Sequence, residues 1–434
     1  MESILSQAKR VAEEAEVFTV SSEETTVQFE SNRLKHLHTK QATSLALRVI
    51  KEGRIGYATT TGMDGGQQLV DDAVETARFG MPVKFQFPGL LSYPQVVVFD
   101  KDVELVPVEK MVGLGEEMIS AVTSDTPGIV CEAGIIRSVI SVRILNSRGG
   151  QAEYRKSVFG MGIEGSLIND TDMLFVGESA DSCHPLPEAN EVTKVVLRQL
   201  ELANNRASVT GRSLPVIFTP DGVASALLMP LMAAFNGKTV LEGASPIGSK
   251  VGQVVFDDKV SLWDDPTISY RPGSRFCDDE GVPSECTTLI EKGKVANFLY
   301  DLQTAAQANA RSTGNGSRSS GGLPAPSASA FIIAPGDTAF EDMVRDMKEG
   351  LIVEHLMGAG QGNVLGGDFS GNVLLGYKVE NGEITGRVKD TMVSGNIYQA
   401  LKKVVAVGNE TKWVGGSLQT PHFCCSGLSV ASKG

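Results

Sequence analysis

Residues 350–396 read GLIVEHLMGAGQGNVLGGDFSGNVLLGYKVENGEITGRVKDTMVSGN, and this stretch decides how the second half of the chain is interpreted. Seven of its first 22 residues are glycine, and apolar runs flank the glycine-rich part. Residues 373–379 have the composition of a strand, and the Asn381-Gly382 dipeptide predicts a hairpin turn after them. Glycine at this density lets a backbone bend and lets another chain come close. The stretch therefore predicts either a strongly curved sheet or a site for a substrate or a metal.

The composition is that of an acidic globular protein. The chain has 434 residues, of which 41% are hydrophobic and 21% charged, and its formal net charge is -13. This length favours two domains over one. The negative charge argues against binding to nucleic acid or to an anionic membrane, because both need a positive field.

The location of the protein is also inferred from composition. The sequence has no run of about 18 apolar residues, so no transmembrane helix is predicted. The N-terminal 16 residues are charged and amphipathic, unlike a signal peptide. The six cysteines show no regular spacing, which is typical of reduced thiols. Together these features predict a cytoplasmic protein.

The order of the predicted elements is that of an α+β protein with two domains. Residues 1–209 combine amphipathic helices with antiparallel strands, including a hairpin around Lys51-Glu52-Gly53. Residues 210–434 are mostly strands and turns, and we predict a β-rich C-terminal domain there.

Two segments of the predicted C-terminal domain matter for function. Thr219-Pro220-Asp221 predicts the start of a helix that continues to about Phe235 and is kinked at Pro230. Residues 314–322, GNGSRSSGG, contain no core-forming residue and are predicted to form a polar, flexible loop.

The sequence lacks the pattern of a zinc peptidase, which needs two histidines one helical turn apart and a glutamate beside the first. The predicted helix 221–235 contains neither histidine nor glutamate. Glu354 and His355 are adjacent, but no second histidine lies within a turn of them. A solvated Glu354 beside a locally hydrogen-bonded His355 is therefore favoured over a metal site.

Other candidate ligands are equally isolated. His36 and His38 have strand spacing and lie on one face, where a solvated hairpin edge is favoured over a weak metal site. Cys424 and Cys425 are predicted to point to opposite faces of a strand, which leaves one of them open to exposure and reaction. No phosphate loop, dinucleotide fingerprint or nucleophile elbow is present. The residues alone predict no catalytic centre, only two glycine-rich polar segments, 312–322 and 358–371.

An ordered set of segments resembles the TldD/PmbA family, whose members were once named modulators of DNA gyrase. The set includes RFCDDEGVPSECTTLIEKGKVANFLYDLQTA from Arg275, STGNGSR (312–318), LIVEHLMGAG (351–360), GGDFSG (366–371) and DTMVSGN (390–396). Near the N-terminus, LALRVIKEGRIGYATTT (45–61) belongs to the same resemblance. It covers nearly the whole chain and implies an α+β fold, a β-rich C-terminal domain, and dimers that enclose a central cavity.

The resemblance also implies which branch of the family is closer. In the TldD branch, an HExxxH helix and a downstream cysteine hold zinc, and the protein is a metalloprotease for unfolded or small peptides. The PmbA branch, also called TldE, lacks the zinc motif and partners the zinc subunit. This chain is similar to the PmbA branch, because helix 221–235 lacks the motif and residues 407–410 contain no cysteine. The resemblance thus implies no catalytic residue, no metal site and no cofactor here, and zinc only in a TldD-type partner.

The predicted substrate-binding residues lie in the glycine-rich segments. Six of them match positions of the family motifs, and Glu354 and His355 complete the set. The predicted set is Asn315, Arg318, Glu354, His355, Gly360, Asp368, Ser370 and Asn396.

Three functions follow from these predictions. The favoured one is a zinc-free subunit whose glycine-rich wall holds an extended peptide by backbone hydrogen bonds, while a TldD-type partner hydrolyses it. The second is a metallopeptidase with an unconventional site built from Glu354, His355 and either His422 or Cys424. The third is a homodimer that binds peptides without turnover.

Overall fold

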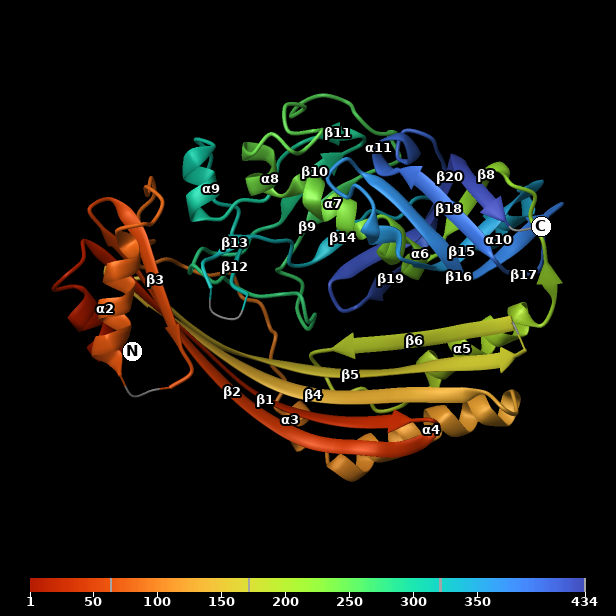
Figure 1. The fold of residues 1–434 in the computed structure, drawn as a ribbon, viewed down its shortest axis with the longest axis horizontal. Coiled ribbons are helices and arrows are strands. Elements are labelled where there is room, and N and C mark those ends of the chain that lie inside the picture. Colours follow the sequence, from red (N-terminus) through yellow and green to blue (C-terminus); the bar gives the residue numbers. More distant parts are fainter. Residues whose placement is uncertain (63–64, 171, 320–321, 433–434) are drawn as a thin grey trace.

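The computed structural model describes residues 1–62, 65–170, 172–319 and 322–432, and contains two large sheets that lie one above the other (Figure 1). The first sheet has six strands in the order β3-β2-β1-β4-β5-β6, and the second has twelve. The predicted α+β fold with a β-rich C-terminal part is confirmed. No helix in the described ranges is long and apolar enough to cross a membrane.

The six-stranded sheet is long, curved and antiparallel throughout (Figure 1). The predicted hairpin at Lys51-Glu52-Gly53 joins the second and third strands, whereas residues 61–129 separate the third strand from the fourth, which pairs with the first. The strands are β1 (Glu14–Glu30), β2 (Arg33–Lys51), β3 (Arg54–Thr60), β4 (Val130–Asn146), β5 (Gln151–Asn169) and β6 (Asp172–Ser182).

Helices cover only one face of this sheet. Helices α1 (Glu2–Ala8) and α2 (Gly66–Ala77) pack over one end, where Val17 belongs to their buried cluster. At the other end Val27 and Phe29 pack with α4 (Val108–Asp125) and α5 (Asn190–Ala203). The opposite face, which carries Glu16 and Phe18, is turned toward the C-terminal half of the chain.

Five strands of the second sheet form a closed ring. Each of them pairs with two others, in the order β8-β15-β16-β18-β20 and back to β8. Closure leaves no free edge within the ring. Residues 350–396 supply three of the strands, so this stretch is the curved sheet that its glycines predict. The ring consists of β8 (Arg212–Phe218), β15 (Glu349–Met357), β16 (Asp368–Glu380), β18 (Thr391–Asn396) and β20 (Leu418–Ser432).

Most of the remaining elements extend or cover this ring, but the first of them along the chain packs on β4 and β5 of the first sheet. They are α3 (Asp102–Leu105), β7 (Arg206–Ala207), α8 (Gly237–Leu241), β9 (Leu262–Asp264), β10 (Thr287–Glu291), β11 (Lys294–Val295), α9 (Leu302–Gln307), β12 (Gly316–Ser317), β13 (Ala325–Pro326), β14 (Phe331–Ile333), α10 (Phe340–Arg345), η1 (Ala359–Gln361), β17 (Glu383–Val388), α11 (Ile397–Ala400) and β19 (Val404–Val414).

The predicted helix from residue 221 to 235 is two helices, α6 (Pro220–Ala226) and α7 (Leu228–Phe235). The break is at Leu227 rather than at Pro230. Proline lacks the N–H that would bond to the carbonyl of Ala226, so the turn before it is the one that opens. The start is as predicted, with the Thr219 hydroxyl accepting a hydrogen bond from the Gly222 N–H.

Two predictions about exposure are wrong. Residues 314–316 are buried rather than part of a flexible loop, because carboxylates from distant segments satisfy their polar groups. Cys424 and Cys425 are both buried. Cys424 packs in the apolar cluster that includes α4 and α5, and Cys425 packs in the core of the second sheet. Neither thiol is therefore exposed.

Glycines in residues 358–371 differ in how much room they have. Gly367 has φ +83°, and a Cβ added there would overlap the ring of Tyr398, whereas a Cβ at Gly360 meets nothing within 4 Å. A larger side chain therefore has room at Gly360 but not at Gly367.

We expect Gly367→Ala to lower the free energy of unfolding by about 2–4 kcal/mol, because it adds left-handed strain to a steric overlap. Gly360→Ala is the matched control and should leave the free energy of unfolding within about 0.5 kcal/mol of the parent value. Urea denaturation followed by circular dichroism measures both. Equal destabilisation by the two substitutions would contradict this account of the loop.

Candidate functional site

The eight predicted substrate-binding residues lie in three separate places. Two of them, Asn315 and Arg318, are buried between the sheets, and Glu354 is enclosed beside the start of α6. The other five are at or near the surface of the closed ring, and they are His355, Gly360, Asp368, Ser370 and Asn396.

The surface group is partly assembled by strand pairing. Asp368 and Asn396 face each other on β16 and β18, and the Asn396 Nδ2 donates to Asp368 Oδ1 and to the Gly366 carbonyl, both at 2.8 Å. Ser370 lies two residues along the same strand and is exposed, as are Gly360 and His355. These side chains are accessible to a ligand.

Asn315 and Arg318 instead have interior partners. Asn315 Nδ2 donates to Asp264 Oδ2 at 2.6 Å, and its Oδ1 accepts from the Thr313 hydroxyl. The Arg318 guanidinium donates to Glu16 on β1 and to the Asp279 carbonyl. Arg318 therefore connects the two layers, whereas Asn315 joins segments within the C-terminal half.

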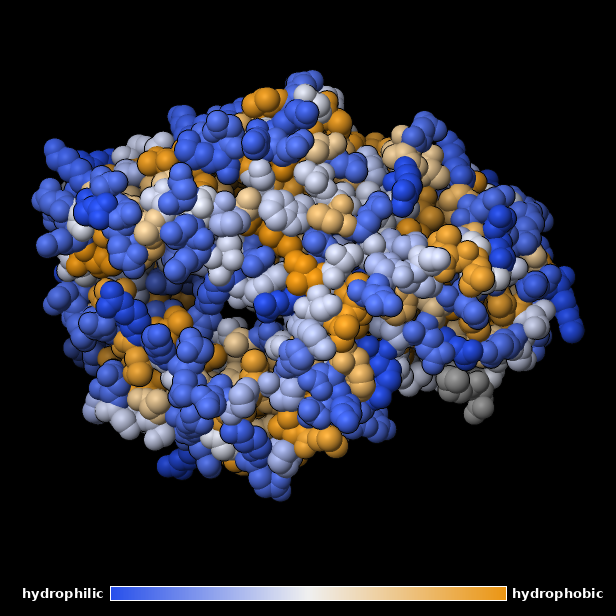
Figure 2. All heavy atoms as spheres, turned by 180° about the vertical axis from the view of Figure 1, so that it is seen from behind, coloured by the Kyte–Doolittle hydropathy of each residue, from blue (hydrophilic) through white to orange (hydrophobic). Residues whose placement is uncertain are grey.

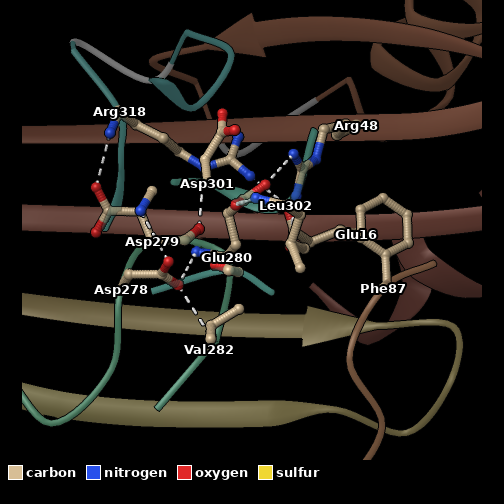
Figure 3. Close-up of polar contacts among 12 residues, drawn as sticks. Glu16, Arg48, Phe87, Asp278, Asp279, Glu280, Val282, Asp301, Leu302 and Arg318 are labelled. Carbon is tan, nitrogen blue, oxygen red and sulfur yellow. Dashed lines mark hydrogen bonds and ion pairs between the residues drawn. The ribbon is translucent and has the colours of Figure 1, made fainter. Parts of the chain in front are cut away.

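Arg318 belongs to a buried network of charges between the sheets (Figure 3). Arg48 on β2 lies between two carboxylates: its Nη1 donates to Glu280 Oε1 at 2.6 Å and its Nη2 to Glu16 Oε2 at 3.1 Å. The second oxygen of Glu280 accepts from the Leu302 N–H at 2.7 Å. Burial disfavours the charged form of Arg48, but the two carboxylates outweigh this and raise its pKa.

A second polar cluster lies at the start of α6 and is formed by Glu178, Asp221, Glu354 and Lys412. The Lys412 ammonium donates to Asp221 Oδ2 at 2.9 Å and to Glu178, and thereby joins β19, α6 and β6. Glu354 lies nearby on β15 and accepts from the Thr219 hydroxyl at 3.2 Å. The sequence interpretation of a solvated Glu354 is wrong, because the side chain is enclosed by these elements.

Enclosure changes the acidity of this α6 cluster. Burial, together with the nearby Asp221 carboxylate, raises the pKa of Glu354 to about 7. Burial also raises the pKa of Glu178. The pKa of Lys412 is raised, since its two carboxylate partners outweigh burial. The Lys412 ammonium thus offsets part of the negative charge of the carboxylates in the α6 cluster.

The cluster contains groups that the sequence did not single out. Glu178, Asp221 and Lys412 come from three distant segments, and only Asp221 carried a signal, as part of the predicted helix start. Within the described ranges, no group of three or more His, Cys, Asp or Glu side chains is arranged to hold a metal ion. Burial lowers the pKa of His422 to about 4, which reflects an enclosed neutral imidazole.

A space lies between the two layers, and the surface seen from behind is hollowed near its middle (Figure 2). The inner face of the six-stranded sheet carries glycines on neighbouring strands. Gly134 pairs with Gly162, which pairs with Ser179, and the next row places Gly160 opposite Asp181. A Cβ at Gly134 would meet nothing within 4 Å, whereas the Asp181 carboxylate covers Gly160. The backbone is therefore open to an extended chain at Gly134.

Comparison of the sequence with models of protein families identifies the family of this chain. The model described as "PmbA/TldA metallopeptidase C-terminal domain" matches residues 210–432, and "PmbA/TldA metallopeptidase domain 1" matches residues 15–77. The chain belongs to the PmbA/TldD family. This membership confirms the resemblance inferred from the sequence.

Relatives of this PmbA/TldD chain match it over most of its length. An uncharacterized protein of Methanocaldococcus jannaschii is 26% identical and covers 94% of this chain and 95% of its own. A "Metalloprotease PmbA homolog" of Haemophilus influenzae is also 26% identical, over 88% of this chain and 84% of its own. The crystal structure of TldE from Thermococcus kodakarensis has the same fold, with a TM-score of 0.90 at 22% identity over 100% of both chains.

We expect Arg48→Met to destabilise the protein by about 3–5 kcal/mol, because it leaves Glu16 and Glu280 buried without their partner. Arg198→Met is the control, since Arg198 pairs with Glu201 on the exposed face of α5 and should cost at most about 1 kcal/mol. Chemical denaturation at neutral pH compares the two. A loss below about 1 kcal/mol for Arg48→Met would show that the network is not needed for stability.

Glu354 makes stability depend on pH in a defined direction. Its pKa in the folded protein, about 7, exceeds the ordinary value of 4.5, so the native state binds the proton more tightly than the unfolded state. Stability is therefore lost as pH rises from about 4.5 to about 7, by up to about 3 kcal/mol.

Glu354→Gln should remove this loss, since glutamine stays neutral and still accepts from Thr219. Relative to the parent, the variant should melt at a higher temperature at pH 8 and at nearly the same temperature at pH 5, as measured by calorimetry. Glu383→Gln, on the exposed end of β17, is the matched control. A parallel pH dependence for the parent and Glu354→Gln would contradict an enclosed, proton-binding carboxyl.

Proposed function

We propose that this chain is the zinc-free, PmbA/TldE-type subunit of a two-subunit peptidase. It holds an extended peptide in the space between its two layers, and a zinc-bearing TldD-type partner cleaves that peptide. Unfolded segments and small peptides are the substrates that fit a backbone-lined space, because they expose hydrogen-bonding groups and little bulk.

The composition of α6 and of its surroundings is the observation that carries this proposal. By resemblance, α6 and α7 occupy the place of the zinc-binding helix, and they offer no histidine or glutamate as a ligand. In the α6 cluster, the Lys412 ammonium already bonds to both Asp221 and Glu178. Its positive charge opposes the approach of a divalent cation to these carboxylates. The long match to a relative named as a PmbA homolog supports the same branch.

The inner face of the six-stranded sheet supports the peptide-holding part of the proposal. Gly134 and Gly162 face each other across β4 and β5, and the open position above Gly134 leaves the backbone approachable there. The surface group of Asp368, Ser370 and Asn396 offers additional polar contacts.

The unconventional metallopeptidase receives less support. It requires Glu354, His355 and either His422 or Cys424 to converge, yet His355 is exposed while Cys424 is buried. The peptide-binding homodimer differs from the favoured proposal in two respects, which are the absence of a zinc-bearing partner and the absence of turnover in every mixture.

The test mixes the purified chain with a family member that carries HExxxH. We expect a stable complex by size-exclusion chromatography with light scattering, and hydrolysis of an unfolded protein substrate that a chelator abolishes. The chain alone should contain far less than one zinc per molecule by mass spectrometry and should not hydrolyse the substrate. The same partner with its HExxxH glutamate changed to glutamine is the control for the source of activity.

Two results would overturn this proposal. Chelator-sensitive hydrolysis by the chain alone, with stoichiometric metal, would establish the metallopeptidase. Peptide binding without association or turnover, across HExxxH-bearing partners that are active with another zinc-free subunit, would favour the homodimer.

A further inference from the structure

The six-stranded sheet has one long edge that no strand covers. β3 pairs with β2 only from Leu45 to Lys51, so residues 33–44 of β2 have a paired strand on one side alone. Figure 1 shows this part of β2 along the lower rim of the sheet, with no strand beyond it. Every residue from Arg33 to Ala42 is exposed, on both faces of the strand.

The other two edges of this sheet each contain a residue whose outward backbone groups are bonded by a side chain. On β6, the side-chain amide of Gln199 bonds to both the N–H and the carbonyl of Gly177, at 2.9 and 3.1 Å. On β3, the Thr76 hydroxyl does the same for Tyr57, at 2.9 Å in both directions. Within the described residues, the outward backbone of positions 33–42 has no such cap. Natural proteins usually cover an edge of this length.

The uncovered edge is basic in a chain whose net charge is -13. It carries Arg33, Lys35 and Lys40 together with His36 and His38, and contains no acidic residue. The nearest carboxylates lie one strand inward, on β1, where Glu30 and Glu24 pair with Arg33 and Lys40 and where Glu23 bonds to Gln41. A strand added outside β2 would have the cations as its direct neighbours and these carboxylates one strand further away.

Apolar side chains also project from this edge. Leu34 and Leu37 are 47% and 49% exposed, and they lie on the same face of the strand because the register shifts by one residue between their partners Phe29 and Val27. Exposed leucines beside unpaired backbone groups offer apolar contacts to one face of an incoming strand.

We propose that residues 33–42, which we call the β2 edge, bind an extended acidic peptide by strand addition. This inference rests on the proposed function and adds the chemical class of the peptide, one rich in Glu or Asp with apolar residues between them. Opposite charges directly across a strand pair are favourable, and like charges are not. A second copy of this edge is a poor occupant for the same reason, because its cations would meet the same cations.

The test measures peptide binding to the full chain, without a partner, by fluorescence anisotropy at low salt. The probe is a labelled ten-residue peptide of alternating Glu and Val, and the comparison peptide has Lys in place of Glu. We expect the Glu peptide to bind at least roughly tenfold more tightly, with affinity falling as salt is added. A Glu peptide with N-methyl groups on alternate residues, which cannot form a ladder, should lose at least about tenfold in affinity.

Variants locate the binding to the β2 edge. Lys35→Glu with Lys40→Glu should reverse the preference between the two peptides. Lys294→Glu with Lys402→Glu changes the net charge equally at exposed positions elsewhere and should not reverse it. Unchanged melting temperatures establish that both double variants fold.

Either of two results would overturn the inference. One is equal binding of the N-methylated and parent Glu peptides, and the other is an unchanged preference for the Glu peptide over the Lys peptide in the edge variant. Loss of association with the zinc-bearing relative in the edge variant, with peptide binding unchanged, would assign the edge to a subunit contact instead. Association itself is scored in the separate mixing assay, so failure of the peptide test leaves the proposed subunit role intact.

Discussion

The buried position of Arg48 between Glu16 and Glu280 is the constraint on which the arrangement of the two layers depends. A guanidinium removed from water needs carboxylates on more than one side, and here they come from β1 and from the segment between β9 and β10. Arg318 repeats the connection by reaching Glu16 from the C-terminal half. These contacts fix the curved sheet against the second sheet and so define the space between them. The glycine-lined inner face and the α6 cluster keep their positions relative to each other for this reason.

Local features of the sequence predicted much of the fold. The hairpins at Lys51-Glu52-Gly53 and Asn381-Gly382 form as expected, because a two- or three-residue turn fixes its own geometry. Closure of the five-stranded ring was not predictable, since β18 pairs with β20 across a long stretch of sequence. The burial of residues 314–316 was not predictable for a related reason. Their polar composition predicts an exposed loop, because the sequence does not show that Asp264 and Asp278 lie beside them and accept their hydrogen bonds.

The candidate site was likewise predictable only where its features are local in the sequence. The empty place of the zinc motif could be read directly, because it is a pattern within one helix. The α6 cluster could not be read, because Glu178, Asp221, Glu354 and Lys412 come from four separate elements. Enclosure also reversed the interpretation of Glu354, since burial is a property of the packed structure and not of the Glu354-His355 dipeptide. The family resemblance, carried by many short segments, was more dependable than any one of the eight residues chosen from it.

A consistent physical account follows from these features. The chain supplies an approachable backbone at Gly134 and an open basic edge, and Lys412 bonds to two carboxylates of the α6 cluster. These features support the proposal that the chain holds a peptide while another subunit provides the metal. Anomalous X-ray scattering at the zinc absorption edge, on crystals of the complex with a zinc-bearing relative, tests this account most directly. The account predicts zinc peaks only within the relative, whereas a zinc peak coordinated by side chains of this chain would contradict it.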